Sequence, residues 1–335
     1  MTIPRADARF RAVTALAVAL AAVVLYFSLR GIQWREVGRI IANASPVPLA
    51  LVLAIASATI FLRAVRWFVL LGGLSRGAEG AGPRRLTIPA VFWATAAGYF
   101  GNNFLPARAG ELLGTMLISA RTGLEIAYVL ATALSERVAD AVVLIGIAAA
   151  VLLTLPAPPG WLAGAMRPFG AVALAGAAAI ALLPLFGSQV HATVARVPMS
   201  VRVRSALAGI VDSLLRGMRA FHDPRRLAPF VALTAIIWTL DAAGVVLGAS
   251  ALGLTISLPL GFLLIAALGL GSALPSTPGY VGIYQFVAVS VLTPFGYSRN
   301  DAIAYILVAQ ALGYVVIGFW GALGLLRYRA ERTTA

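Results

Sequence analysis

Long apolar stretches, separated by short polar ones, dominate the pattern of this sequence. A helix needs about 20 apolar residues to cross a bilayer. By that measure the chain predicts about six full spans, at residues 10–29, 46–71, 124–155, 169–186, 227–252 and 301–326. A shorter segment at 34–44 alternates charged with apolar residues, which is typical of a helix lying in the membrane interface. The pattern therefore predicts an all-α polytopic membrane protein, with residues 1–335 forming a single transmembrane domain.

Composition supports a membrane protein and excludes an ordinary soluble enzyme. Hydrophobic residues make up 61% of the chain and charged residues only 11%, whereas a soluble domain is about one-quarter charged. The net charge of +14 comes from arginines, because the sequence contains no lysine. These arginines sit between apolar runs, so they indicate topology and contact with anionic lipid headgroups rather than with nucleic acid. With no cysteine and two widely separated histidines, His191 and His222, we predict neither a metal nor a cofactor.

The distribution of arginines orients the spans. Cytoplasmic loops carry an excess of basic residues. With the N-terminus in the cytoplasm, the arginine-rich segments at 72–87, 187–226 and the C-terminus all fall on the inner side, whereas the opposite segments, 156–168 and 253–257, contain only Arg167. We therefore expect a multi-pass protein of the cell (inner or plasma) membrane with both termini in the cytoplasm.

The basic segment 187–226 joins two halves of the chain, at about 46–186 and 227–327. Its apolar residues recur at helical spacing, from Leu207 to Met218. This predicts an amphipathic helix along the inner leaflet, with arginines toward anionic headgroups. A solvated helix without lipid contact is the alternative.

Each half also contains a pair of short apolar segments, at 88–105 with 106–120 and at 258–274 with 276–295. Both pairs carry the pattern Leu-Pro-x-x-x-Gly, which begins at Leu105 in the first and at Leu274 in the second. In the topology above, the first pair starts and ends on the inner side and the second on the outer side. Similar broken helices of opposite topology are typical of inverted repeats, in which they mark a site near the midplane. We therefore predict two re-entrant helical hairpins, with two thin pairs of full spans as the alternative.

Eight charged residues fall inside apolar segments, namely Arg63, Arg66, Arg108, Glu111, Glu136, Arg137, Asp140 and Asp241. Each costs about 2.5–3.5 kcal/mol at the centre of a membrane helix. We therefore expect them either to pair in a neutral structural network or to line a pathway for a substrate or ion. As a further alternative, Arg63 and Arg66 reach the inner interface beside Trp67.

The broken helices offer a site for an anionic group, because a helix N-terminus presents free backbone N–H groups and the positive end of its dipole. Arg108 follows Pro106 in the first pair, and the hydroxyls of Ser276 and Thr277 precede Pro278 in the second. The acidic residues could meet a cationic group or carry a proton. The candidate substrate-binding residues are Asn103, Pro106, Arg108, Gly110, Glu111, Glu136, Arg137, Asp140, Pro275, Ser276, Thr277, Pro278, Gly279 and Gly282.

Three motifs resemble the membrane domain of the lysylphosphatidylglycerol synthetase/flippase family. They are Asn103-Phe-Leu-Pro-Ala-Arg-Ala-Gly-Glu111, Ser135-Glu-Arg-Val-Ala-Asp140 and Leu274-Pro-Ser-Thr-Pro-Gly-Tyr-Val-Gly-Ile-Tyr-Gln285. Tyr280 stands where a glycine is common in that family. The resemblance implies a bundle with two re-entrant hairpins that moves lipids between leaflets. We do not carry over the lysine-transferring activity, because no aminoacyltransferase domain follows Ala335 in this sequence.

The leading functional hypothesis is a lipid flippase or scramblase that moves a phospholipid or a lipid-linked headgroup through a midplane site. It would have no ATPase of its own, since the chain has no lysine with which to form a phosphate-binding Gly-x-x-x-x-Gly-Lys loop. One alternative is an intramembrane enzyme acting on a lipid phosphate. The other is a scaffold for a lipid- or glycan-modifying enzyme, in which Gly318, Gly321 and Gly324 pack helices or a second protomer to form a homodimer.

Overall fold

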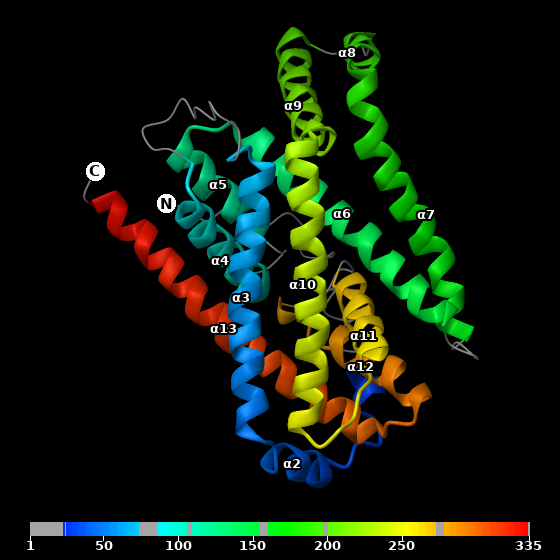
Figure 1. The fold of residues 1–335 in the computed structure, drawn as a ribbon. Helices are drawn as coiled ribbons and strands as arrows, with labels where there is room; N and C mark the ends of the chain where they lie inside the picture. Colours follow the sequence, from blue (N-terminus) through cyan, green and yellow to red (C-terminus); the bar gives the residue numbers. More distant parts are fainter. Residues whose placement is uncertain are drawn as a thin grey trace.

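The fold of the described residues is helical, as predicted, and contains no strand (Figure 1). The computed structural model describes residues 23, 25–73, 86–105, 109–154, 160–196, 200–272 and 278–333. In chain order, the α-helices are α2 (Trp34–Ala42), α3 (Pro46–Leu70), α4 (Ile88–Phe104), α5 (Gly110–Thr122), α6 (Ile126–Leu153), α7 (Gly160–Leu182), α8 (Gly187–Arg196), α9 (Val201–Arg219), α10 (Pro224–Ala251), α11 (Leu258–Gly271), α12 (Ile283–Leu292) and α13 (Arg299–Thr333). Short 3-10 turns join several of them, including η2 (Leu183–Phe186) and η4 (Pro278–Tyr280).

Four helices of the described part are long and apolar enough to cross a membrane, at Pro46–Leu70, Gly170–Arg196, Pro224–Ala251 and Arg299–Arg329. They match four of the predicted spans, although α7 continues through η2 into α8 and so extends the span expected at 169–186. Helix α6 has comparable length but carries three charged residues near its middle. Most of the predicted first span lies outside the described residues. The expected interfacial helix forms as α2, with Val37 buried.

Local sequence signals explain where several of these helices begin. Side-chain oxygens of Thr87, Ser257 and Asp223 accept hydrogen bonds from backbone N–H groups in the first turns of α4, α11 and α10. A proline occupies one of the first two helical positions in each case, where its missing N–H costs nothing. At the other end of the first hairpin, α5 stops at Gly123, which adopts φ +73°.

The two short pairs each fold as a helical hairpin, α4 with α5 and α11 with α12. In Figure 1, α4 and α5 lie beside α3, and α11 and α12 lie lower in the view beside α10. The long helices α3 and α10 run side by side between them. One hydrophobic core joins α6, α10, α11, α12 and α13, and a second joins α3, α4, α5 and α6. Helix α6 takes part in both cores, so both hairpins pack on it.

Glycines bring α4 and α5 into backbone contact. A Cβ atom added to Gly101 would lie 2.7 Å from the Cα atom of Gly110, and one added to Gly98 would lie 3.1 Å from the carbonyl oxygen of Gly110. Small residues at helix contacts permit this close approach inside a membrane. The α4–α5 hairpin therefore depends on the absence of side chains at these positions.

The glycines near the end of α13 face α4 within the same chain. A Cβ atom on Gly324 would lie 2.8 Å from the carbonyl oxygen of Trp93, and one on Gly321 would lie 2.9 Å from that of Ala96. The sequence left open whether these glycines pack helices or a second protomer. In the fold their contacts are intramolecular.

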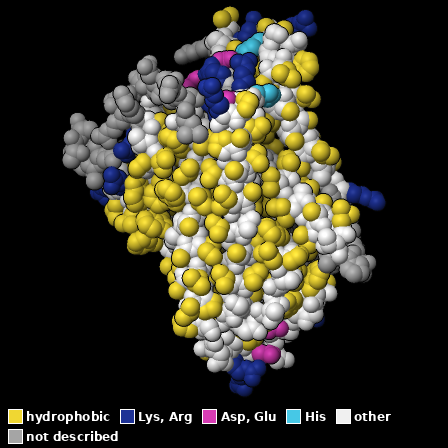
Figure 2. Space-filling model, viewed as in Figure 1, with side chains coloured by type: hydrophobic (Ala, Val, Ile, Leu, Met, Phe, Trp, Pro, Cys, Tyr) yellow, Lys and Arg dark blue, Asp and Glu magenta, His cyan; other side chains and the backbone are white. Residues whose placement is uncertain are grey.

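The amphipathic helix expected in the basic segment is present as α9, but its orientation differs from the one predicted. Figure 1 shows α9 standing above α10 and roughly in line with it. Its C-terminal half packs on α6, where Ser213 and Leu215 are buried and Gly217 lies against Ala131. Packing on α6 keeps α9 roughly in line with α10. An amphipathic pattern alone does not specify this packing. Arginines and histidines gather at this end of the molecule (Figure 2).

We predict that Gly101→Ala destabilises the protein by about 1–3 kcal/mol, because the new methyl group must push α5 away from α4. Gly146→Ala in α6 is the matched control, since a Cβ atom there would meet nothing within 4 Å. Thermal unfolding of the purified protein in detergent measures both variants. Equal midpoints for the two alanine variants would contradict the close packing of the hairpin.

Candidate functional site

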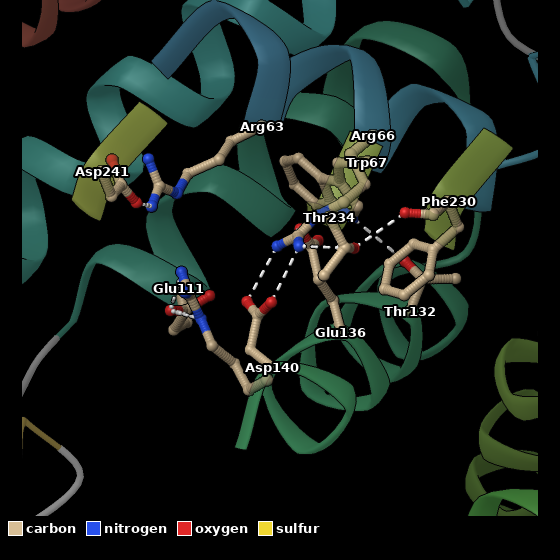
Figure 3. A network of polar contacts seen from close by, with 11 residues as sticks. Arg63, Arg66, Trp67, Glu111, Thr132, Glu136, Asp140, Phe230, Thr234 and Asp241 are labelled. Atoms are coloured by element: carbon tan, nitrogen blue, oxygen red, sulfur yellow. Dashed lines mark hydrogen bonds and ion pairs between the residues drawn. The ribbon is translucent and has the colours of Figure 1, made fainter. Parts of the chain in front are cut away.

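The most buried charge in the described structure is Arg66 of α3, whose side chain is 1% exposed. Its Nη1 and Nη2 atoms donate to the two carboxylate oxygens of Asp140, each at 2.8 Å. Its Nε atom donates to Glu136 Oε1 at 2.8 Å, and Nη1 also donates to the hydroxyl of Thr234 at 3.0 Å (Figure 3). The guanidinium lies over the ring of Phe230, 5.1 Å from its centroid. Arg66 therefore ties α3 to α6 and α10 with its hydrogen-bonding edge occupied.

Two further ion pairs lie beside Arg66. Arg63, one turn earlier in α3, donates from Nη2 to Asp241 Oδ2 of α10 at 2.5 Å. Arg137 of α6 donates from Nε to Glu111 Oε1 of α5 at 3.0 Å, and the same oxygen accepts a 3.1 Å hydrogen bond from Asn102 of α4. Each pair joins different helices, as in Figure 3 for Arg63 and Asp241.

Seven of the eight intramembrane charges are thus paired, in the Arg66 trio and the two neighbouring ion pairs, and Arg108 lies outside the described residues. The sequence suggested pairing from spacings within a helix. In the structure the pairs form between helices. Residues three or four apart on one helix lie on the same face, so both point toward a neighbouring helix that carries the partner. Arg66 is held inside the bundle rather than reaching the interface beside Trp67, which is itself buried.

A cavity of about 360 Å³ opens beside this network, between the two hairpins. Charged side chains from three helices line it, namely Arg63, Arg137, Asp140 and Asp241. Its other walls are aromatic, aliphatic or amide-bearing. They include Thr59, Ile60, Tyr99, Asn102, Asn103, Trp238, Gly269, Ser272, Gly279, Tyr280, Tyr284, Tyr305, Gln310 and Tyr314. The cavity therefore combines a charged side with a broad apolar one.

The turn of the second hairpin is anchored to α13 at the edge of this cavity. The carbonyl oxygen of Gly279 accepts hydrogen bonds from Tyr314 Oη at 2.6 Å and from Gln310 Nε2 at 3.0 Å. Gln285 hydrogen-bonds Gln310 and accepts from the backbone N–H of Gly282 at 2.7 Å. These contacts hold an irregular turn whose backbone groups would otherwise lack partners.

Tyr280 adopts φ +61°, a left-handed conformation that glycine reaches far more easily than tyrosine. Its ring stacks on Tyr284 with centroids 4.9 Å apart, and both rings line the cavity. This explains why the position suits glycine. In this chain the ring contributes to the wall of the cavity.

A smaller polar pocket of about 40 Å³ lies next to the main cavity and shares Arg63, Tyr99, Asn102 and Arg137 with it. The small pocket is also lined by Gly110, Glu111 and Glu136, which do not line the main cavity. The buried Oγ1 atom of Thr95 has no hydrogen-bond partner among the described residues. A pocket of this size holds a few water molecules, which polar groups of this kind require.

The predicted site residues are thus distributed over two neighbouring spaces. The main cavity is lined by Asn103, Arg137, Asp140 and Gly279. The small pocket is lined by Gly110, Glu111, Glu136 and, again, Arg137. Gly282 lines neither space and lies in the turn of the second hairpin, where its N–H donates to Gln285. Pro106, Arg108, Pro275, Ser276 and Thr277 lie outside the described residues, and of Pro278 only the backbone is described, at the start of η4.

Sequence reasoning assigned Arg63 and Asp241 to the network but omitted them from the site, and it missed Tyr99, Trp238, Gln310 and Tyr314. A polar or aromatic residue recurring along one face of an apolar helix was the available signal for these positions. No group of three His, Cys, Asp or Glu side chains in the described part of the chain is arranged to hold a metal ion.

These features define a polytopic membrane protein with a partly charged internal cavity. A family model described as "Lysylphosphatidylglycerol synthase TM region" matches residues 14–321, and the chain belongs to that family. The chain is also similar, at 27% identity, to a Haloferax volcanii protein named Glycosyltransferase AglD. The match covers 95% of this chain and 54% of that protein, so the chain spans about half the length of this relative.

We predict that Arg66→Met destabilises the protein by about 3–5 kcal/mol, because it leaves two buried carboxylates without their cation. Asp140→Asn is expected to cost less, since Arg66 keeps its pair with Glu136. The triple variant Arg66→Met/Glu136→Gln/Asp140→Asn removes every charge of the trio and should recover part of the loss. Thermal unfolding in detergent compares the three, and a triple variant no more stable than Arg66→Met would contradict this account.

Proposed function

We propose that this protein translocates a phosphate-bearing lipid between leaflets, as a flippase or scramblase. One observation carries the proposal: a cavity with a charged side and an apolar side lies between two broken-helix hairpins. A lipid headgroup crossing a bilayer needs polar partners along its path, and its chains need apolar ones. Ionisable residues inside a membrane are costly and commonly mark such a pathway. Membership of the family supports a lipid-related role.

Arg63 and Arg137 are the residues proposed to bind the phosphate. Both line the cavity, and Tyr99 lies beside them. Among the described residues, Arg63 reaches a carboxylate through Nη2, and Arg137 directs Nε and Nη2 to one oxygen of Glu111. Each guanidinium carries five N–H donors in a planar fork suited to phosphate. Arg66, by contrast, donates from Nε, Nη1 and Nη2 to carboxylates and is assigned a structural role.

The two hairpins are proposed to be re-entrant and related as an inverted repeat. They lie toward opposite ends of the central helices in Figure 1, and the turn η4 contacts α4. With the arginine-rich end bearing α8 and α9 in the cytoplasm, the first hairpin would enter from the inner side and the second from the outer side. Small movements of either hairpin would then open the cavity to one leaflet at a time.

A lipid-linked sugar is the second substrate class that an observation favours. The relative named Glycosyltransferase AglD aligns with nearly the whole of this chain, which covers about half of that protein. A membrane region shared with a protein of that name supports a substrate in which a sugar is joined to a lipid through phosphate. The arginine site and the apolar wall suit this substrate as well as a glycerophospholipid.

To test translocation, the purified protein is reconstituted into liposomes with headgroup-labelled phosphatidylglycerol, and a membrane-impermeant quencher measures the label that becomes accessible. We expect protein-dependent exchange that falls at least tenfold in Arg137→Gln, because a neutral amide cannot hold the phosphate. Arg39→Gln is the control, since Arg39 is a mostly exposed side chain on α2. Unchanged exchange in a folded Arg137→Gln variant would overturn the assigned phosphate site.

The same liposomes with a fluorescent sugar on polyprenyl phosphate or pyrophosphate distinguish the two substrate classes. Faster exchange of the polyprenyl-linked sugar than of phosphatidylglycerol is expected if the chain serves a glycan-assembling reaction. The reverse order would assign it to glycerophospholipids. No exchange of either lipid by the wild-type protein would contradict translocation itself.

A further inference from the structure

A second hollow of the molecule, an aromatic groove, lies outside the cavity just described. It measures about 340 Å³ and is lined by Ser57, Phe61, Ile88, Pro89, Phe92, Trp93 and Trp320, from α3, α4 and α13. Phe61 is 47% exposed, so the groove reaches the molecular surface. Its lining is almost entirely apolar, and the indole N–H of Trp320 is satisfied by the hydroxyl of Ser57 at 3.1 Å. Such a surface suits hydrocarbon.

The groove adjoins the cavity along two helices. On α3, Ala56 and Ile60 line the cavity, whereas their neighbours Ser57 and Phe61 line the groove. On α13, Ile317 lines the cavity and Trp320 lines the groove one helical turn later. At 3.6 residues per turn these two positions share a face of the helix. Trp320 and its contact with Ser57 therefore stand between the two spaces.

The two sides of the groove differ in how tightly they are closed. Helices α4 and α13 meet backbone to backbone at Gly321 and Gly324, where even a methyl group would collide with α4. Helices α3 and α13 meet there through the hydrogen bond of Trp320, and Phe92 bridges them with its ring centroid 5.4 Å from Trp320 and 6.0 Å from Phe61. A side-chain contact of this kind separates at far smaller cost than a glycine-packed backbone seam. The α3–α13 side is therefore the one able to open.

A positive charge lies against one wall of the groove and favours an anionic occupant. The guanidinium of Arg327, two turns beyond Trp320 on α13, lies 5.6 Å from the ring centroid of Trp93. A lipid whose chain fills the groove would thus have its anionic phosphate near a cation before the headgroup moves toward Arg63.

We propose that the groove binds an acyl chain of the phosphate-bearing lipid and that Trp320, hydrogen-bonded to Ser57, is a lateral gate through which the headgroup enters the cavity. The proposal rests on the proposed translocation of lipid. It adds where the lipid enters, which helices separate and which contact holds them closed. Phosphatidylglycerol serves as the probe.

The gate is tested by exchange measurements on Ser57→Cys/Trp320→Cys, treated with a short bis-methanethiosulfonate linker. The native chain has no cysteine, so only the introduced pair can react. We expect the linker to slow exchange at least tenfold and a reducing agent to restore it. Each single-cysteine variant treated with the same linker is the control. Unchanged exchange after verified linkage would overturn the gate while leaving translocation intact.

A milder variant guards against misfolding of the double substitution. Ser57→Ala removes the acceptor for Trp320 with little change in volume, and exchange should rise about two- to tenfold, as expected for the loss of one hydrogen bond that holds the closed state. Val315→Ala is the matched control, because Val315 is exposed on α13 and lines neither the groove nor the cavity. Equal effects of the two variants would count against the gate.

Binding is measured independently of exchange. Phosphatidylglycerol carrying a photoreactive diazirine in its acyl chain is irradiated with the protein, and mass spectrometry locates the adducts. Adducts concentrated in residues 57–61, 88–93 and near Trp320 would support the groove, whereas adducts spread evenly over the apolar surface would overturn it. A wild-type protein that exchanges no lipid would overturn the proposed function and the gate together.

Discussion

The fold depends on the burial of one arginine in an apolar bundle. An uncompensated guanidinium in a membrane interior is so unfavourable that Arg66 must find its partners. It does so on two other helices, with Glu136 and Asp140 on α6 and Thr234 on α10. This requirement fixes how α3, α6 and α10 face each other. The neighbouring pair Arg63–Asp241 and the cation of the pair Arg137–Glu111 then lie in the wall of one cavity.

Ion pairs and glycine packing stabilise different helix contacts of the bundle. Between helices in lipid there is little hydrophobic driving force, so close packing and polar contacts supply the specificity. Glycines let α4 approach α5 on one side and α13 on the other. The ion pairs join α3, α5, α6 and α10. Among the described residues beside the aromatic groove, neither glycine packing nor an ion pair joins α3 to α13. There the hydrogen bond between Trp320 and Ser57 and the ring contacts of Phe92 connect the two helices.

Much of the architecture followed from the linear pattern. The apolar stretches predicted the long helices α3, α10 and α13, because helix length and bilayer thickness are directly related. The Leu-Pro-x-x-x-Gly repeats located both hairpins, since proline and glycine interrupt helices for local reasons. The motifs at 103–111 and 135–140 predicted the charged and amide side chains that α4, α5 and α6 contribute to the site. The orientation of α9 did not follow, because its packing on α6 is a tertiary contact.

The sequence by itself determined that this chain is helical, belongs in a membrane and carries charges that require partners, because each of these properties is set residue by residue through hydrophobicity, helix geometry and the cost of burying charge. Only the tertiary structure decided which charges pair, since Arg66 and Asp140 are far apart along the chain and meet through helix packing. It also decided that Tyr99, Trp238, Gln310 and Tyr314 share a cavity with Arg63 and Arg137. A cavity is a property of how helices fail to fill the space between them, and no single helix encodes it.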